Sequence, residues 1–155
     1  MIIVSACLLG FNCRYNGERS PDTQLLLSPV RDQYVPVCPE QLGGLPTPRA
    51  PSEITCGDGF DVLEGRSRII SDSGVDVTDC FLRGANEVMR IVELFGISEA
   101  IMRDKSPSCG VCCIKRTGSI VKGSGVTSAL LSKNGIGVTS SDKIKYELET
   151  KTYRL

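Results

Sequence analysis

Three short runs rich in apolar and β-branched residues are each followed by a cysteine, and this pattern constrains the fold most strongly. The pairs of run and cysteine are 1–6 with Cys7, 34–37 with Cys38, and 97–102 with Cys109. The first run shows no alternation of apolar and polar residues, which is typical of a strand buried on both faces of a parallel sheet. We therefore expect buried strands that end close to cysteines.

The clearest helix is expected over residues 78–95. Apolar side chains recur there at spacings of three and four residues, which places them on one helix face. They are Phe81, Ala85, Val88, Val92 and Phe95. Thr78 or Asp79 is the expected N-terminal cap, and Gly96 supplies the stop.

The C-terminal third continues the alternation of strands and helices. A hairpin through Gly118 and Gly123 is expected before a helix over 126–133 and a last short strand over 136–139. Such alternation predicts an α/β fold with a mainly parallel sheet. The length of 155 residues predicts one domain over 1–155.

Three segments carry weaker signals. A short helix is expected over 25–32, where Pro29 interrupts it, and a small hairpin is expected over 62–77. Residues 39–59 contain four prolines and a Gly-Gly pair, so we expect a structured loop without a regular element.

Composition excludes several classes of function. The chain has no histidine, which removes imidazole bases, Ser-His and Cys-His dyads and histidine-containing metal sites. Its 18 Lys and Arg residues balance 18 Asp and Glu residues, so no nucleic-acid partner is expected from charge. There is no apolar run long enough to cross a membrane and no secretory signal, so we expect a cytoplasmic protein without a membrane partner.

Eight cysteines are the main chemical clue. Thiols stay reduced in the cytosol, which favours metal ligation or thiol chemistry over disulfides. Loops at the carboxyl ends of parallel strands converge on one crevice, so Cys7, Cys38 and Cys109 are expected to meet there. Three thiolates without histidine suit a soft metal or an iron–sulfur cluster.

Other interpretations of the cysteines stay open. Free thiols also serve as small buried hydrophobes, which is the favoured interpretation for Cys56 and Cys80. Cys109 and Cys112 form a C-x-x-C sequence that suits a thiol oxidoreductase, although the residues after it resemble a strand rather than a helix. A structural zinc site is a further alternative, but only one close cysteine pair of the usual two is present.

Three polar residues near these cysteines are candidates for catalysis. Glu40 lies two residues beyond Cys38, and without histidine a carboxylate is the natural base for water. The alternative is a solvated loop glutamate. Ser106 and Ser108 could orient a water or substrate, or could hydrogen-bond the turn around Pro107.

Four ordered motifs resemble the bacterial thiouracil desulfidase family over about residues 1 to 140. They are Ser5-Ala6-Cys7-Leu8-Leu9-Gly10 with Cys13-Arg14-Tyr15-Asn16-Gly17; Pro36-Val37-Cys38-Pro39-Glu40 with Gly43-Gly44-Leu45 and Pro48-Arg49; Lys105-Ser106-Pro107-Ser108-Cys109-Gly110; and Gly125-Val126-Thr127 with Ala129-Leu130-Leu131. The resemblance implies a Rossmann-like α/β domain and hydrolytic removal of sulfur from a thiolated pyrimidine, with release of sulfide.

The resemblance also implies a cofactor and roles for individual residues. A [4Fe–4S] cluster would be held by Cys7, Cys38 and Cys109, which leaves one iron without a protein ligand. The catalytic glutamate would be Glu40, and the catalytic serine would be Ser106, with Ser108 as the fallback. A non-enzymatic module that carries a metal or cluster stays as an alternative beside the oxidoreductase.

The chain departs from the family pattern after Cys109. It continues through Cys112 and Cys113, which could supply a fourth ligand and close the open iron. We expect that neither binds, because the chain after Gly110 turns away into the expected hairpin.

The ligand hypothesis makes a direct prediction. Replacing Cys7, Cys38 or Cys109 by Ser should remove most of the bound iron, because a hydroxyl is a poor substitute for a thiolate. Cys56→Ser and Cys80→Ser should retain it. Iron and sulfide analysis of anaerobically purified variants measures the effect, and full iron retention in Cys38→Ala would contradict the hypothesis.

Overall fold

The computed structural model describes residues 1–144, and a four-stranded parallel sheet lies at its centre. The strands are β1 (Ile2–Ser5), β2 (Tyr34–Val37), β5 (Glu99–Met102) and β8 (Gly137–Ser140), in the order β2-β1-β5-β8. Ile3 of β1 pairs with Val35 on one side and Ala100 on the other. The predicted parallel α/β architecture is confirmed, and residues 145–155 of the predicted domain lie outside the described range.

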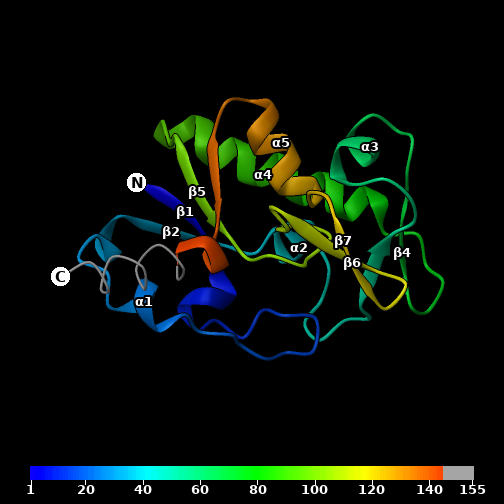
Figure 1. Cartoon of the computed structure of the whole chain (residues 1–155), viewed down its shortest axis with the longest axis horizontal. Coiled ribbons are helices and arrows are strands. Elements are labelled where there is room, and N and C mark those ends of the chain that lie inside the picture. Colours follow the sequence, from blue (N-terminus) through cyan, green and yellow to red (C-terminus); the bar gives the residue numbers. More distant parts are fainter. Residues whose placement is uncertain (145–155) are drawn as a thin grey trace.

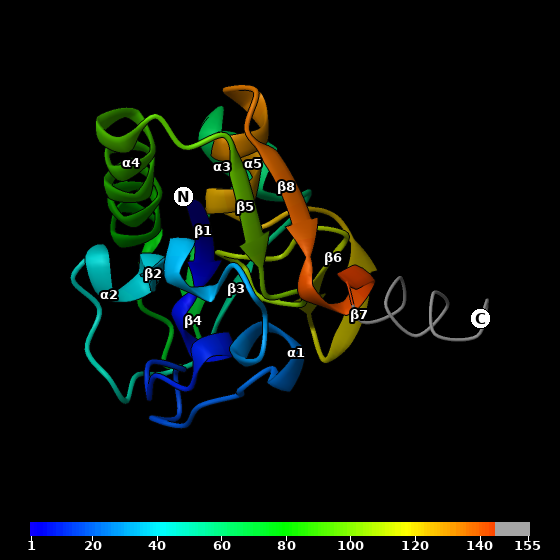
Figure 2. The same ribbon diagram turned by 90° about the vertical axis from the view of Figure 1, so that its left-hand side faces the viewer.

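Helices cover both faces of the sheet, as in a Rossmann-like fold (Figures 1 and 2). On one face, α4 (Thr78–Phe95) and α5 (Val126–Lys133) contribute Val88, Val92 and Leu131 to a core with sheet residues. On the other face, Leu8 of the 3₁₀ helix η1 (Ala6–Leu9) and Leu25 of α1 (Thr23–Leu26) pack around Val4. None of the helices within residues 1–144 is both long and apolar enough to cross a bilayer.

Helix α4 has the predicted bounds but not the predicted cap. Asp76 accepts the backbone N–H of Thr78 at 2.9 Å, whereas the Thr78 hydroxyl accepts the N–H of Ile69 and ties the helix to β4. Gly96 ends the helix with a left-handed φ of 62°, as expected. Phe95 is half exposed, so the last turn of the helix does not bury the predicted apolar face.

The weakly predicted segments differ most from expectation. Residues 39–59 include α2 (Pro39–Leu42), which begins with a proline at its first position, and β3 (Ser52–Ile54). The predicted hairpin over 62–77 is confirmed only around Gly74, where Ile70 and Asp76 form an antiparallel bridge. Its first part is wrong, because α3 (Gly59–Leu63) precedes β4 (Ile69–Ser71), and β4 pairs antiparallel with β3.

The helix expected over 25–32 is also shorter and earlier. Asp22 caps α1 through the N–H groups of Gln24 and Leu25, and α1 ends at Leu26, before Pro29. A separate 3₁₀ turn, η2 (Arg31–Gln33), then leads into β2. The local cap and the proline together therefore divide this segment into two short pieces.

The hairpin after Cys109 is present as predicted. Strands β6 (Cys113–Arg116) and β7 (Ser119–Lys122) pair antiparallel. Together with β3, β4, α3 and the N-terminal part of α4, this hairpin surrounds a second core. Figure 1 shows these elements beyond one end of the sheet, where they extend the fold past the carboxyl ends of the strands.

Two glycines let α2 lie against α4 at backbone contact. A Cβ on Gly43 would overlap the carbonyl of Cys80, and a Cβ on Gly84 would overlap the carbonyl of Pro39. Because α2 directly follows Cys38 and contains Glu40, this close approach fixes the position of both residues relative to the sheet.

Gly84→Ala should therefore destabilise the protein by about 1–3 kcal/mol through overpacking. It should also displace Pro39 and its neighbours. Gly137→Ala is the matched control, since its Cβ would meet only the Ser98 oxygen at an ordinary 3.6 Å. Urea denaturation measures the free energy of unfolding of the two variants. Equal stability would show that α2 can move away from α4 without loss of stability.

Candidate functional site

A cavity of about 370 Å³ opens at the carboxyl edge of the parallel sheet. This volume lies in the range of small-molecule sites. Its wall includes Cys7, Cys13, Cys38, Glu40, Ser106 and Cys109, together with several Arg, Lys and Asp side chains. The structure thus brings together all three predicted cysteines, the predicted glutamate and one of the two predicted serines.

Each predicted cysteine arrives from the end of a different strand. Cys7 lies in η1, directly after β1, and Cys38 is the residue before the first turn of α2, directly after β2. Cys109 lies in a tight turn seven residues beyond β5. Cys7 and Cys109 are each 8% exposed, so the thiols are largely shielded from water.

A fourth thiol, that of Cys13, was not expected at the site. It is 5% exposed and packs in the same buried cluster as Cys7, and its carbonyl oxygen accepts a hydrogen bond from the Cys38 thiol at 3.6 Å. The chain turns back after η1 at Gly10, which has a left-handed φ of 91°, and this turn returns Cys13 to the side of Cys7. No strand precedes Cys13, but it belongs to the same sequence motif as Cys7, six residues away, and this is the signal that could have indicated it.

The thiols influence one another's acidity. The hydrogen bond from Cys13 lowers the pKa of Cys38 and that of Cys7, because it stabilises their thiolate forms. The same hydrogen bonds raise the pKa of Cys13, which serves as the donor. Burial raises the pKa of Cys109, although a hydrogen bond with Ser5 partly opposes it.

The turn that carries Cys109 is fixed by two sets of hydrogen bonds. The Ser106 hydroxyl accepts the backbone N–H groups of Ser108 and Cys109, each at 3.1 Å. The start of α5 holds the other side, where the Ser128 hydroxyl donates to the Cys109 carbonyl at 2.7 Å. Ser106 therefore has a positioning role and also faces the cavity.

Ser108 occupies a different environment. It is 1% exposed, its hydroxyl pairs with that of Thr127 at 3.0 Å, and it does not line the cavity. The structure therefore places Ser106 in the site and gives Ser108 a structural contact with α5.

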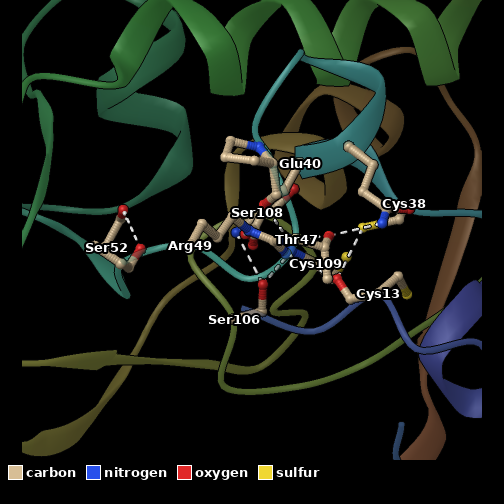
Figure 3. A network of polar contacts seen from close by, with 12 residues as sticks. Cys13, Cys38, Glu40, Thr47, Arg49, Ser52, Ser106, Ser108 and Cys109 are labelled. Atoms are coloured by element: carbon tan, nitrogen blue, oxygen red, sulfur yellow. Dashed lines mark hydrogen bonds and ion pairs between the residues drawn. The ribbon is translucent and has the colours of Figure 1, made fainter. Parts of the chain in front are cut away.

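Glu40 is held by Arg49. Arg49 Nε donates to Glu40 Oε2 at 2.6 Å, and the two side chains are only 6% and 16% exposed. Figure 3 shows how the other guanidinium nitrogens reach the carbonyl oxygen of Cys13 at 2.9 Å and the hydroxyl of Thr47 at 3.0 Å. Glu40 Oε1 accepts no hydrogen bond from any residue in the range 1–144 and remains available at the cavity.

Cys112 and Cys113 do not line the cavity. Asp104 Oδ1 accepts the backbone N–H groups of Val111, Cys112 and Cys113 at 2.9–3.1 Å, which turns the chain into β6. Burial alone would raise the pKa of Asp104, but these bonds and one with Ser140 stabilise its charge and lower its pKa overall.

The other cysteine hypotheses gain no geometric support. Cys112 is exposed and leads into a strand, whereas a C-x-x-C redox pair normally begins a helix. Within residues 1–144, no three Cys, Asp or Glu side chains are arranged around a position for a single metal ion. Cys56 and Cys80 also lie off the cavity wall.

The buried ion pair makes a testable prediction. Arg49→Met leaves the Glu40 carboxylate unpaired and should destabilise the protein by about 3 kcal/mol. Arg68→Met is the control, because the Arg68–Asp76 pair is exposed and such pairs contribute little. Urea denaturation measures the free energy of unfolding of both variants. An equal loss of stability in the two would mean that the Arg49 contacts do not stabilise the fold.

Comparison with known proteins places this site in a family. The chain is 40% identical over 147 residues to YbbK of Bacillus subtilis (strain 168), a protein without a characterised function, and the match covers 93% of this chain and 97% of that one. A solved structure described as the [4Fe-4S]-dependent thiouracil desulfidase TudS is similar with a TM-score of 0.80 and 36% identity, covering 99% of this chain and 98% of that chain. The family model for 2-thiouracil desulfurase matches residues 2–143, so the chain belongs to the 2-thiouracil desulfurase family.

Proposed function

We propose that this protein is a [4Fe–4S]-dependent desulfidase that hydrolyses the carbon–sulfur bond of thiouracil-type compounds and releases sulfide. The observation that carries the proposal is the convergence of Cys7, Cys38 and Cys109 on one cavity that also contains Glu40 and Ser106. Membership of the 2-thiouracil desulfurase family supports a thiolated pyrimidine as the substrate.

The residues at the cavity suit an iron–sulfur cluster. Thiolates are the usual ligands of such clusters, and the cavity gathers cysteines in a chain without histidine. Cys7, Cys38 and Cys109 would hold the cluster, one from each strand end. When bound, it supplies a thiophilic Lewis acid for the thiocarbonyl sulfur, and no net electron transfer is required.

Glu40 would act as the general base for the attacking water. Its Oε2 is held by Arg49, which fixes the direction of the carboxylate, and its free Oε1 is the atom that would take the proton. The ion pair thus orients the base while leaving one oxygen for chemistry.

Ser106 would orient that water. Its oxygen already accepts two backbone N–H groups, so its hydroxyl proton is left for a hydrogen bond into the cavity. Ser108 is already paired with Thr127, which favours Ser106 for this role.

The competing functions fit less well. A thiol oxidoreductase that uses Cys109 and Cys112 would join a buried residue on the cavity to an exposed residue off it. A module that only carries a cluster would not need a buried, oriented carboxylate beside the thiols. The proposed substrate is a small thiolated pyrimidine. The proposal also includes a cytoplasmic location and no nucleic-acid or membrane partner.

Glu40→Gln separates catalysis from cluster assembly. The amide still accepts the hydrogen bond from Arg49 but cannot take a proton, so turnover should fall by about 10²-fold or more. Anaerobic assays of uracil and sulfide formation from thiouracil, together with iron analysis, measure both effects; the cluster content should stay unchanged.

The Cys112→Ala/Cys113→Ala protein is the matched control, because both residues lie off the cavity. It should keep its cluster spectrum and its rate of sulfide release. Absence of sulfide release by the cluster-loaded wild-type protein would contradict the proposed function, and full turnover by Glu40→Gln would remove the role of Glu40.

A further inference from the structure

We propose that the side chain of Tyr15 is the platform on which the flat ring of the pyrimidine substrate stacks. This inference rests on the proposed function and deepens it. Within the described range 1–144, Tyr15 is the only aromatic residue on the cavity wall, and it is 41% exposed. Aromatic side chains commonly line small-molecule sites, where polar groups then fix the orientation of the ligand.

The backbone of Tyr15 is anchored to the residue that holds Glu40. The backbone N–H of Arg49 donates to the Tyr15 carbonyl at 2.7 Å, and the Arg49 guanidinium donates to Glu40 at 2.6 Å. A second bond from that guanidinium reaches the carbonyl of Cys13 at 2.9 Å. Arg49 therefore ties the segment that carries the aromatic ring to the proposed base.

A tight turn also restrains the chain around Tyr15. The N–H of Gly17 donates to the carbonyl of Arg14 at 2.8 Å, and the N–H of Arg14 donates to the carbonyl of Glu18 at 3.2 Å. Gly17 has a left-handed φ of 76°, which glycine adopts without strain. Because the backbone is held, only the two side-chain torsions of Tyr15 must be fixed when a ligand binds, and this costs little conformational entropy.

Arg14 occupies one face of the Tyr15 ring. Its guanidinium carbon lies over the ring, 5.9 Å from the centroid, which is within the range of a cation–π contact. Arg14 is in turn 3.8 Å from the carboxylate of Glu18. The guanidinium restrains the ring, and the pyrimidine stacks on the face that it leaves uncovered.

Stacking determines the side from which water attacks the substrate. A nucleophile approaches the carbon of a thiocarbonyl group roughly perpendicular to its plane, so the reacting atoms must be aligned in that direction. Tyr15 covers one face of the pyrimidine and excludes water from it. Glu40 of α2 and Ser106 of the turn after β5 line the same cavity, and the water that they hold attacks the opposite face.

Binding of uracil and of dihydrouracil tests this platform without turnover. The two ligands carry the same carbonyl and N–H groups, but dihydrouracil lacks the planar aromatic ring. Isothermal titration calorimetry of the anaerobic, cluster-loaded protein measures both dissociation constants. The wild-type protein should bind uracil more tightly than dihydrouracil. Tyr15→Ala should weaken uracil binding by about 5- to 150-fold, the range of base–aromatic stacking, and should weaken dihydrouracil binding much less.

Two further variants separate stacking from a structural role of this segment. Tyr15→Phe keeps the aromatic face and should bind both ligands as the wild type does. Phe11→Ala is the matched control, because Phe11 belongs to the same segment and is 54% exposed but lies off this cavity. It should leave both dissociation constants unchanged. In turnover assays, only Tyr15→Ala should lower kcat/KM for thiouracil.

Equal losses for uracil and dihydrouracil in Tyr15→Ala would overturn the stacking role. A wild-type protein that binds the two ligands equally would also overturn it, and this comparison decides even where Tyr15→Ala does not fold. Failure of the proposed function is a separate result, because it is the absence of sulfide release from thiouracil by the cluster-loaded wild type. A failure of stacking alone leaves that release intact.

Discussion

Parallel pairing of β1 with both β2 and β5 is the constraint on which the site depends. All three strands end at the same edge, so the segments that follow them must meet there whatever their separation in sequence. Cys7, Cys38 and Cys109 span more than a hundred residues of chain but reach a single cavity. The packing of α4 and α5 on one face and of η1 and α1 on the other holds the sheet that sets this edge.

Buried polar groups then fix the segments beyond the strands. Arg49 joins the Glu40 carboxylate to the backbone of Cys13, and Asp104 gathers three backbone N–H groups after Cys109. Buried charges are stable only when their hydrogen bonds are satisfied, so each of these networks favours one arrangement of its loop. The cavity is therefore built from irregular chain, but its walls are held by specific donors and acceptors.

Close backbone packing fixes the positions of the helices around the site. Gly84 lets α4 approach α2 beside Glu40, and Gly125 brings the start of α5 against Ser108. These contacts couple the positions of the large helices to those of the short segments that carry Glu40 and Cys109. They also explain why a substitution far from the thiols is expected to disturb the site.

The sequence by itself determined the elements whose signal is local. Apolar runs gave the strands, the spacing of apolar residues gave α4 with its bounds, and placement after strands selected Cys7, Cys38, Glu40 and Cys109 as neighbours. Tertiary structure decided what depends on contacts between distant segments: the pairing of β3 with β4, the arrival of Cys13 among the thiols, the ion pair between Arg49 and Glu40, and the separate environments of Ser106 and Ser108. Periodicity reports which face of an element is buried. It does not specify how a turn at Gly10 or a buried guanidinium directs a loop, because those positions depend on the hydrogen-bonding and packing partners that folding brings together.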